Sequence, residues 1–194
     1  MRKNILTIDF DIIMWPSVEL YSKLPDSPWE EKLNRFPTLN NCIIDYELYY
    51  QLTKLIVRLS KKVKKENIYF ITDHDEIIKY LSLDDSYNVL NIDHHHDWYY
   101  DKKDAIVVQN LNCGNWVKYL NENFILNNYL WVDSPNSMIE KELENIQIFK
   151  CFSIMDFDFD NIEMTPDFLF ISLSPAWVPP YIAPLFNAWK SICE

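Results

Sequence analysis

Side chains of the kind that bind metal ions gather in three short stretches of this 194-residue chain. The stretches are residues 7–11 (TIDFD), 72–76 (TDHDE) and 91–97 (NIDHHHD). Each one lies at the end of an apolar run that is typical of a buried strand. All four histidines of the chain lie in the last two stretches. Because aspartate and histidine are common ligands of divalent cations, the pattern predicts a metal centre.

The spacing within these stretches predicts which side chains lie together. In a strand, residues i, i+2 and i+4 share one face. The side chains predicted to share a face are Asp9 with Asp11, and Asp93 with His95 and Asp97. His94 and His96 would then point the other way. Since the carboxyl ends of parallel strands meet in one crevice, we expect the three stretches to converge there.

The predicted ligand set contains four carboxylates and two imidazoles. Its members are Asp9, Asp11, His74, Asp93, His95 and Asp97. This composition suits Mn²⁺ or a similar ion better than zinc, which favours thiolates or three imidazoles. Two ions about 3.5–4 Å apart, bridged by a carboxylate and a water, would use all six ligands. The alternative interpretation is a set of acidic surface turns with histidine caps.

A second acidic run, residues 156–160 (DFDFD), also contains a DxD pattern. It could supply ligands in place of Asp9 and Asp11. The competing interpretation is a solvated segment of alternating polarity that leads into a turn.

The composition excludes several classes of protein. A net charge of −11 makes nucleic acid an unsuitable partner and favours a cationic substrate or a metal ion. Gly114 is the single glycine, which excludes the glycine-rich loops of dinucleotide-binding proteins and P-loop enzymes. The four cysteines show no CxxC spacing, and we predict reduced thiols in a cytoplasmic protein. No signal peptide or membrane span is apparent, so no membrane association is expected.

The elements expected around the metal centre alternate along the chain. The hydrophobic pattern predicts strands at 5–13, 68–72, 88–92, 129–132, 146–154 and 168–173, and helices at 43–63, 76–83, 115–123 and 179–192. Residues 17–36 are expected to form a loop with short helical pieces. We therefore predict one α/β domain over residues 1–194, with a mostly parallel sheet in a three-layer α/β/α arrangement.

The metal-type motifs resemble those of the arginase-like (ureohydrolase) superfamily, namely DH, DxHxD and DxD. Here these are Asp73-His74, the run Asp93-His94-His95-His96-Asp97, and Asp9-Phe10-Asp11. The later segments Gly114-Asn115-Trp116 and Ser174-Pro175-Ala176-Trp177 resemble elements of the small peptide arginases. The resemblance spans residues 5–180 and implies an arginase-like fold. The motif order is permuted, because the DxD opens this chain and comes last in ordinary arginases.

The resemblance also implies a reaction and a role for each site residue. The reaction is the Mn²⁺-dependent hydrolysis of arginine side chains, within a ribosomally made precursor peptide, to ornithine and urea. In the implied centre of two Mn²⁺ ions, Asp93 and Asp9 bridge the ions, His74 and Asp97 complete one site, and His95 and Asp11 complete the other. The implied catalytic residues are Asp93, Asp97 and His94, and the implied substrate-binding residues are Asn115, Ser174 and Trp177.

Two roles known from ordinary arginases lack an obvious residue here. No histidine follows His96, so the proton-shuttle role is empty or is filled by His94 or His96. Ala176 lies near the position of the acid that faces the substrate. Candidates for that acid are Asp75, Glu76 and Asp133. The aromatic residues Trp98, Tyr99 and Tyr100 would either rim the crevice or belong to the core.

Two other functions are compatible with the motifs. Asp9-x-Asp11 together with Asp93-His94-His95 matches the DxD and DHH motifs of DHH-type phosphoesterases, which also use two metals. Those enzymes bind phosphates with glycine-rich and basic elements, which this acidic chain lacks. The third interpretation is a metal-stabilised protein that binds a peptide without turning it over. The sequence carries no signature of an oligomeric state.

Overall fold

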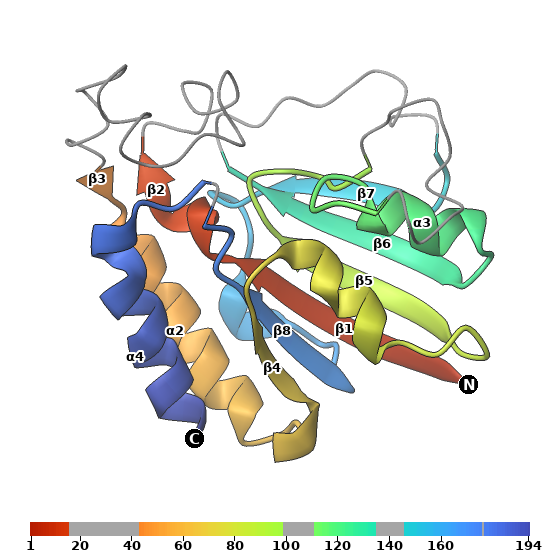
Figure 1. The fold of residues 1–194 in the computed structure, drawn as a ribbon, viewed down its shortest axis with the longest axis horizontal. Helices are drawn as coiled ribbons and strands as arrows, with labels where there is room; N and C mark the ends of the chain where they lie inside the picture. The colour runs from red at the N-terminus through yellow and green to blue at the C-terminus, as the bar shows by residue number, and fades with distance from the viewer. Residues whose placement is uncertain (16–42, 99–110, 135–145, 176) are drawn as a thin grey trace.

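A six-stranded sheet forms the centre of the computed structural model, which describes residues 1–15, 43–98, 111–134, 146–175 and 177–194. All its strand pairs are parallel, in the order β4-β8-β1-β5-β6-β7 (Figure 1). The strands are β1 (Arg2–Asp9), β4 (Ile68–Ile71), β5 (Ser86–Ile92), β6 (Leu126–Asp133), β7 (Phe149–Ser153) and β8 (Phe168–Ser172). The two-residue strands β2 (Met14–Trp15) and β3 (Ile43–Ile44) form a separate antiparallel pair. The predicted α/β class is confirmed.

Both faces of the sheet are buried, because successive side chains of its strands point to opposite sides. Leu6 and Ile8 of β1 belong to the core under α2 (Tyr46–Ser60) and α4 (Ala183–Cys193). Ile5 belongs to the core under α3 (Trp116–Glu122) and the 3₁₀ helix η5 (His74–Tyr80). In the described part of the chain this second face carries only short helices, so a complete third layer stays a prediction.

Helix α2 shows how the sequence fixes one of these layers. The side chain of Asp45 accepts a hydrogen bond from Leu48 N at 2.9 Å and caps the first turn. The buried residues of α2 recur at helical spacing and face the sheet: Leu52, Leu55, Ile56 and Leu59. Trp189 of α4 stacks on Tyr49 with ring centroids 5.1 Å apart and donates a hydrogen bond to Thr53. The two helices therefore pack together over β1.

Two predicted elements differ in the structure. The strand expected at 5–13 ends at Asp9, and the chain continues as the 3₁₀ helix η1 (Phe10–Ile13). All four residues of η1 are buried, and a buried apolar run does not distinguish a strand from a helical turn. The helix expected at 76–83 is the 3₁₀ helix η5. The loop expected at 17–36 lies outside the described residues.

The helix expected at 43–63 begins only at Tyr46, because Ile43–Ile44 form β3, and the strands after β4 lie close to their predicted positions. The segment expected as one closing helix divides into a 3₁₀ helix η9 (Pro180–Ile182) and α4. The other 3₁₀ helices are η4 (Lys65–Asn67) and η8 (Phe159–Asn161). Within the described ranges, no helix combines the length and the apolar character needed to cross a membrane. A cytoplasmic location stays a prediction.

Candidate metal centre

The predicted ligands come from the carboxyl ends of three parallel strands. Asp9 is the last residue of β1, and Asp11 follows within η1. His74 is the first residue of η5, directly after β4, while Asp93 and His95 follow β5. Because β8 lies between β4 and β1, His74 reaches across the end of β8 to meet Asp9. The expected convergence of the three stretches is therefore present in the fold.

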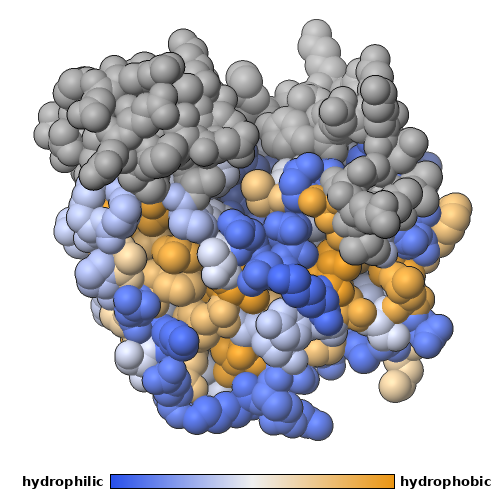
Figure 2. All heavy atoms as spheres, in the orientation of Figure 1, coloured by the Kyte–Doolittle hydropathy of each residue, from blue (hydrophilic) through white to orange (hydrophobic). Residues whose placement is uncertain are grey.

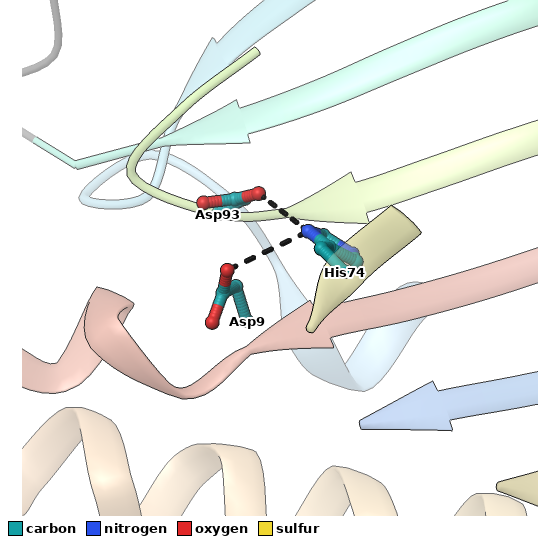
Figure 3. A group of neighbouring side chains, drawn as sticks. All are labelled: Asp9, His74 and Asp93. Carbon is teal, nitrogen blue, oxygen red and sulfur yellow. Dashed lines mark ion pairs between the residues drawn. The ribbon is translucent and has the colours of Figure 1, made fainter. Parts of the chain in front are cut away.

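Ligand atoms of these residues form two groups that share one member. Asp9, His74 and Asp93 make the first ligand group, and Asp11, Asp93 and His95 make the second. Within each ligand group the candidate atoms all lie within 4.8 Å of one another. Figure 3 shows the first ligand group, with both carboxylates turned toward the His74 ring. Asp93 alone belongs to both groups, so its carboxylate is placed to bridge two cations.

The surroundings of His74 Nδ1 fit a shared cation. This atom lies 3.0 Å from Asp93 Oδ2, 2.9 Å from Asp97 Oδ2 and 3.5 Å from Asp9 Oδ2. When six ligand atoms surround a cation octahedrally at metal–ligand distances of about 2.1 Å, neighbouring ligand atoms are about 3 Å apart, which is close to the distances found here. Among the described residues, several buried polar atoms here lack a hydrogen-bond partner: His74 Nδ1, Asp9 Oδ1, and both carboxylate oxygens of Asp11. Such unpartnered atoms are costly unless a cation or a proton satisfies them.

A threonine in the middle of β1 orients the His74 ring. Thr7 Oγ1 lies 2.6 Å from His74 Nε2, and both residues are completely buried. If Nε2 carries the proton and donates it to Thr7, then Nδ1 presents its lone pair to the carboxylates. Metal-binding histidines are commonly fixed in this way through the second ring nitrogen.

The charges in the centre shift the pKa values of the ligands strongly. Burial, reinforced by Asp11 and Asp93, raises the pKa of Asp9 well above its usual value. Burial lowers the pKa of His74, but the carboxylates of Asp97 and Asp93 outweigh it and raise the net value well above the usual range. Burial opposes ionisation of Asp93, yet its contacts with His74 and His95 lower its pKa to about 2. In the metal-free chain, a proton on His74 therefore offsets part of the carboxylate charge.

Asp97 lies beside the first ligand group without belonging to either one. Its Oδ2 is 2.9 Å from His74 Nδ1 and accepts a hydrogen bond from Trp116 Nε1 at 2.6 Å. Asp97 has φ 51°, a left-handed conformation that aspartate adopts more readily than most residues other than glycine. Burial and the neighbouring Asp93 charge raise the pKa of Asp97 to about 7.

The single strand face predicted for residues 93–97 is wrong. Strand β5 ends at Ile92, and the following residues turn. The Asp93 side chain accepts a hydrogen bond from His95 N at 2.9 Å, which closes an Asx-type turn. This turn, rather than strand alternation, brings His95 to the same side as Asp93. An aspartate side chain can accept a hydrogen bond from the backbone N–H two residues later, which favours a turn. This preference competes with the strand pattern.

The two remaining histidines do not belong to either ligand group. The Nδ1 atom of His94 lies 2.5 Å from the hydroxyl of Ser134, which follows β6. His96 is completely buried, accepts a hydrogen bond from Trp98 N, and packs its ring 5.4 Å from Trp131. Burial, with the charge of His95, lowers the pKa of His96 to about 4. Of the two proton-shuttle candidates, His94 is the one whose ring lies next to that of a ligand, 5.1 Å from His95.

The three residues expected to bind substrate have different surroundings. Ser174 Oγ donates a hydrogen bond to Asp9 Oδ2 at 2.6 Å, which makes Ser174 a support for a ligand. The Asn115 side chain accepts a hydrogen bond from Asn112 N within the loop before α3. The ring of Trp177 lies 5.2 Å from that of His95. Of the three, Trp177 lies beside the most exposed of the ligand side chains, that of His95, which is 22% exposed.

Sequence patterns missed the buried groups that hold the ligands. They include Thr7 against His74, Trp116 against Asp97, and Asn91, whose amide donates to Asp93 Oδ2 at 3.3 Å. Trp131 Nε1 also donates to the backbone oxygen of Asp93 at 2.9 Å. A single threonine or asparagine inside an apolar strand could have indicated these contacts, since a buried polar side chain needs a hydrogen-bond partner.

Neither Trp98 nor the second acidic run contributes a member to the two ligand groups. Trp98 is 6% exposed and belongs to the core, while Tyr99 and Tyr100 lie outside the described residues. Asp158 accepts hydrogen bonds from Asp160 N and Asn161 N and so caps η8. Neither ligand group includes a residue of this second run. Asp9 and Asp11 are thus the DxD that the structure brings to the centre.

Comparison with protein-family models, with curated proteins and with solved structures finds no match. The resemblance to arginases therefore rests on the motifs, and the proposals below rest on the geometry of the site.

The metal-free chain is expected to lose stability as the pH rises. The pKa of His95 is lowered by burial but raised by Asp11 and Asp93, to about 9 from 6.5. A raised histidine pKa stabilises the fold fully below pH 6.5, and this contribution is lost as the pH approaches 9. The free energy of unfolding, measured by denaturant titration in a chelator, should fall by on the order of 1 kcal/mol or more across this window. The decline should be smaller in His95→Gln, and an increase in the wild type would contradict this prediction.

Proposed function

We propose that this protein is a two-metal hydrolase that converts arginine side chains within a peptide to ornithine and urea. The observation that carries the proposal is the shared position of Asp93 in two ligand groups. Such a site suits the chemistry, because a guanidinium is always protonated and its carbon is a poor electrophile that needs an activated nucleophile. Two bound Mn²⁺ ions would supply a water of lowered pKa as the nucleophile at neutral pH.

The residues around the ligands suit the other steps of this reaction. The four buried carboxylates Asp9, Asp11, Asp93 and Asp97 balance the charge of two divalent ions. We assign proton transfer from the water to the leaving amine to Asp97, because its carboxylate adjoins His74 without belonging to a ligand group.

The substrate would enter beside the second ligand group. His95 is its partly exposed member, and Trp177 lies against it with ring centroids 5.2 Å apart. Guanidinium groups stack on indole rings, so Trp177 would form one wall of the entry.

We assign orientation of the guanidinium to Asp133. It ends β6, next to the end of β5 from which Asp93 follows, and is 9% exposed. Its Oδ1 has no hydrogen-bond partner within the described residues. A buried carboxylate oxygen of this kind matches the fork of donors that a guanidinium offers. Glu76, by contrast, already binds Lys79 Nζ at 2.8 Å.

Peptide arginine, rather than free arginine, is the expected substrate. A free amino acid would need further groups to hold its α-carboxylate and α-amine, and the ligand groups here are dominated by acids. The Mn²⁺-loaded protein should release urea from arginine-containing peptides, with loss of 42 Da per modified arginine by mass spectrometry, as the departure of CH₂N₂ from each side chain requires. Urea release from free arginine alone would contradict the peptide preference and leave the reaction type intact.

The same assay separates this proposal from its alternatives. Phosphate release from a nucleotide, without urea from any peptide, would favour a phosphoesterase. Peptide binding with no product of either kind would favour a non-catalytic binding protein. The Asp133→Asn variant tests the role assigned to Asp133. It should raise the KM for the peptide and leave Mn²⁺ binding unchanged.

A further inference from the structure

The first turn of α3 contacts Asp97 in two ways. Trp116, the first residue of α3, donates its indole N–H to Asp97 Oδ2 at 2.6 Å. The next residue, Val117, donates its backbone N–H to the Asp97 backbone oxygen at 3.2 Å. Adjacent residues of one helix therefore hold both the carboxylate and the peptide group of Asp97.

Asp97 is buried next to the first ligand group. Its backbone is left-handed, with φ 51°, and its side chain is 4% exposed. The held oxygen, Oδ2, is the one that lies 2.9 Å from His74 Nδ1. An indole N–H is a donor only, so Asp97 Oδ2 is the acceptor of this hydrogen bond.

Trp116 also contacts the histidine of the first ligand group directly. Its ring centroid lies 5.2 Å from that of His74, with the planes tilted by 47°. Trp116 itself is completely buried, so little space remains for either ring to turn. One side chain thus restricts both Asp97 and His74.

We infer that Trp116 is a positioning residue of the metal centre: it holds Asp97 Oδ2 beside His74 Nδ1, at the edge of the first ligand group, and so keeps a further carboxylate next to a cation bound by Asp9, His74 and Asp93. This inference rests on the metal centre of the proposed function. Trp116 acts through Asp97 and His74. If Trp116 had a purely structural role in the core, its truncation would change cation affinity no more than the same truncation of another buried tryptophan.

The chain offers a matched control for this role in Trp189. Trp189 is also completely buried and also donates its indole N–H to a side chain, Thr53 Oγ1, at 2.7 Å. It lies in α4, on the opposite face of the sheet. Trp116→Phe and Trp189→Phe therefore delete the same atoms from equally buried places, and both should lower the unfolding temperature of the metal-free chain.

Mn²⁺ titration by calorimetry and electron paramagnetic resonance distinguishes the two variants. Trp116→Phe should weaken Mn²⁺ binding by about 10–100-fold, as loss of a group supporting a metal ligand typically does. Trp189→Phe should bind Mn²⁺ as the wild type does. Adding Trp116→Phe to Asp97→Asn should weaken binding little further, because Trp116 acts largely through Asp97.

Three results would overturn the inference: equal affinities in Trp116→Phe and Trp189→Phe, fully additive losses in the double variant, or a wild-type chain that binds no Mn²⁺. The last result would also overturn the proposed metal centre. Wild-type protein that binds Mn²⁺ without releasing urea would overturn the proposed reaction alone, since the affinity comparison still decides the role of Trp116.

Discussion

The Asp93→Asn variant is expected to bind no Mn²⁺ ion tightly, whereas His95→Gln should keep one of two. The difference follows from the shared position of Asp93 in both ligand groups, while His95 belongs to the second alone. Urea release should fall by more than about 100-fold in both variants, since loss of even an outer partner of a ligand costs about 10–100-fold. Metal analysis of the dialysed proteins gives the two stoichiometries.

Both substitutions are chosen to preserve the local fold. Asparagine at position 93 retains the Oδ1 atom that accepts the hydrogen bond from His95 N. Circular dichroism should show native secondary structure in each variant. Equal stoichiometries in the two variants, or two ions retained in His95→Gln, would contradict the assignment of ligands to two overlapping groups.

The second large effect is expected from the N-terminal DxD. Asp9→Asn combined with Asp11→Asn should abolish urea release and Mn²⁺ binding by both ligand groups, because each group loses one carboxylate. Addition of Mn²⁺ should stabilise the wild type, because the ion binds the folded chain, and it should not stabilise the double variant.

The matched control is Asp156→Asn combined with Asp158→Asn, which changes the other DxD. Asp156 is exposed, and asparagine at 158 keeps an oxygen that can cap η8. We expect Mn²⁺ binding and urea release within about twofold of the wild type, since surface substitutions usually change little. Loss of activity in this control, with activity retained in the first double variant, would show that the centre uses Asp156 and Asp158 and not Asp9 and Asp11.

Local patterns were sufficient for the sheet and for the convergence of its polar ends. Apolar runs located the strands, and the parallel arrangement followed from their alternation with helices. The rule that parallel strands present their carboxyl ends at one edge then brought Asp9, His74 and Asp93 together. Each of these steps depends on residues close together in the sequence.

The details of the centre depend on long-range contacts that no local pattern contains. Thr7 meets His74 across 67 residues, and Ser174 meets Asp9 across 165. The strand order, with β8 between β4 and β1, places Ser174 beside Asp9. The turn after β5 was misassigned because an Asx turn and a strand compete for the same polar sequence.

The most direct test of the central claim is anomalous scattering from crystals grown with Mn²⁺. We expect two peaks at the manganese edge, one next to Asp9, His74 and Asp93 and the other next to Asp11, Asp93 and His95, separated by about 3.5–4 Å. A single peak, or no peak within reach of the Asp93 carboxylate, would contradict the proposed two-metal centre.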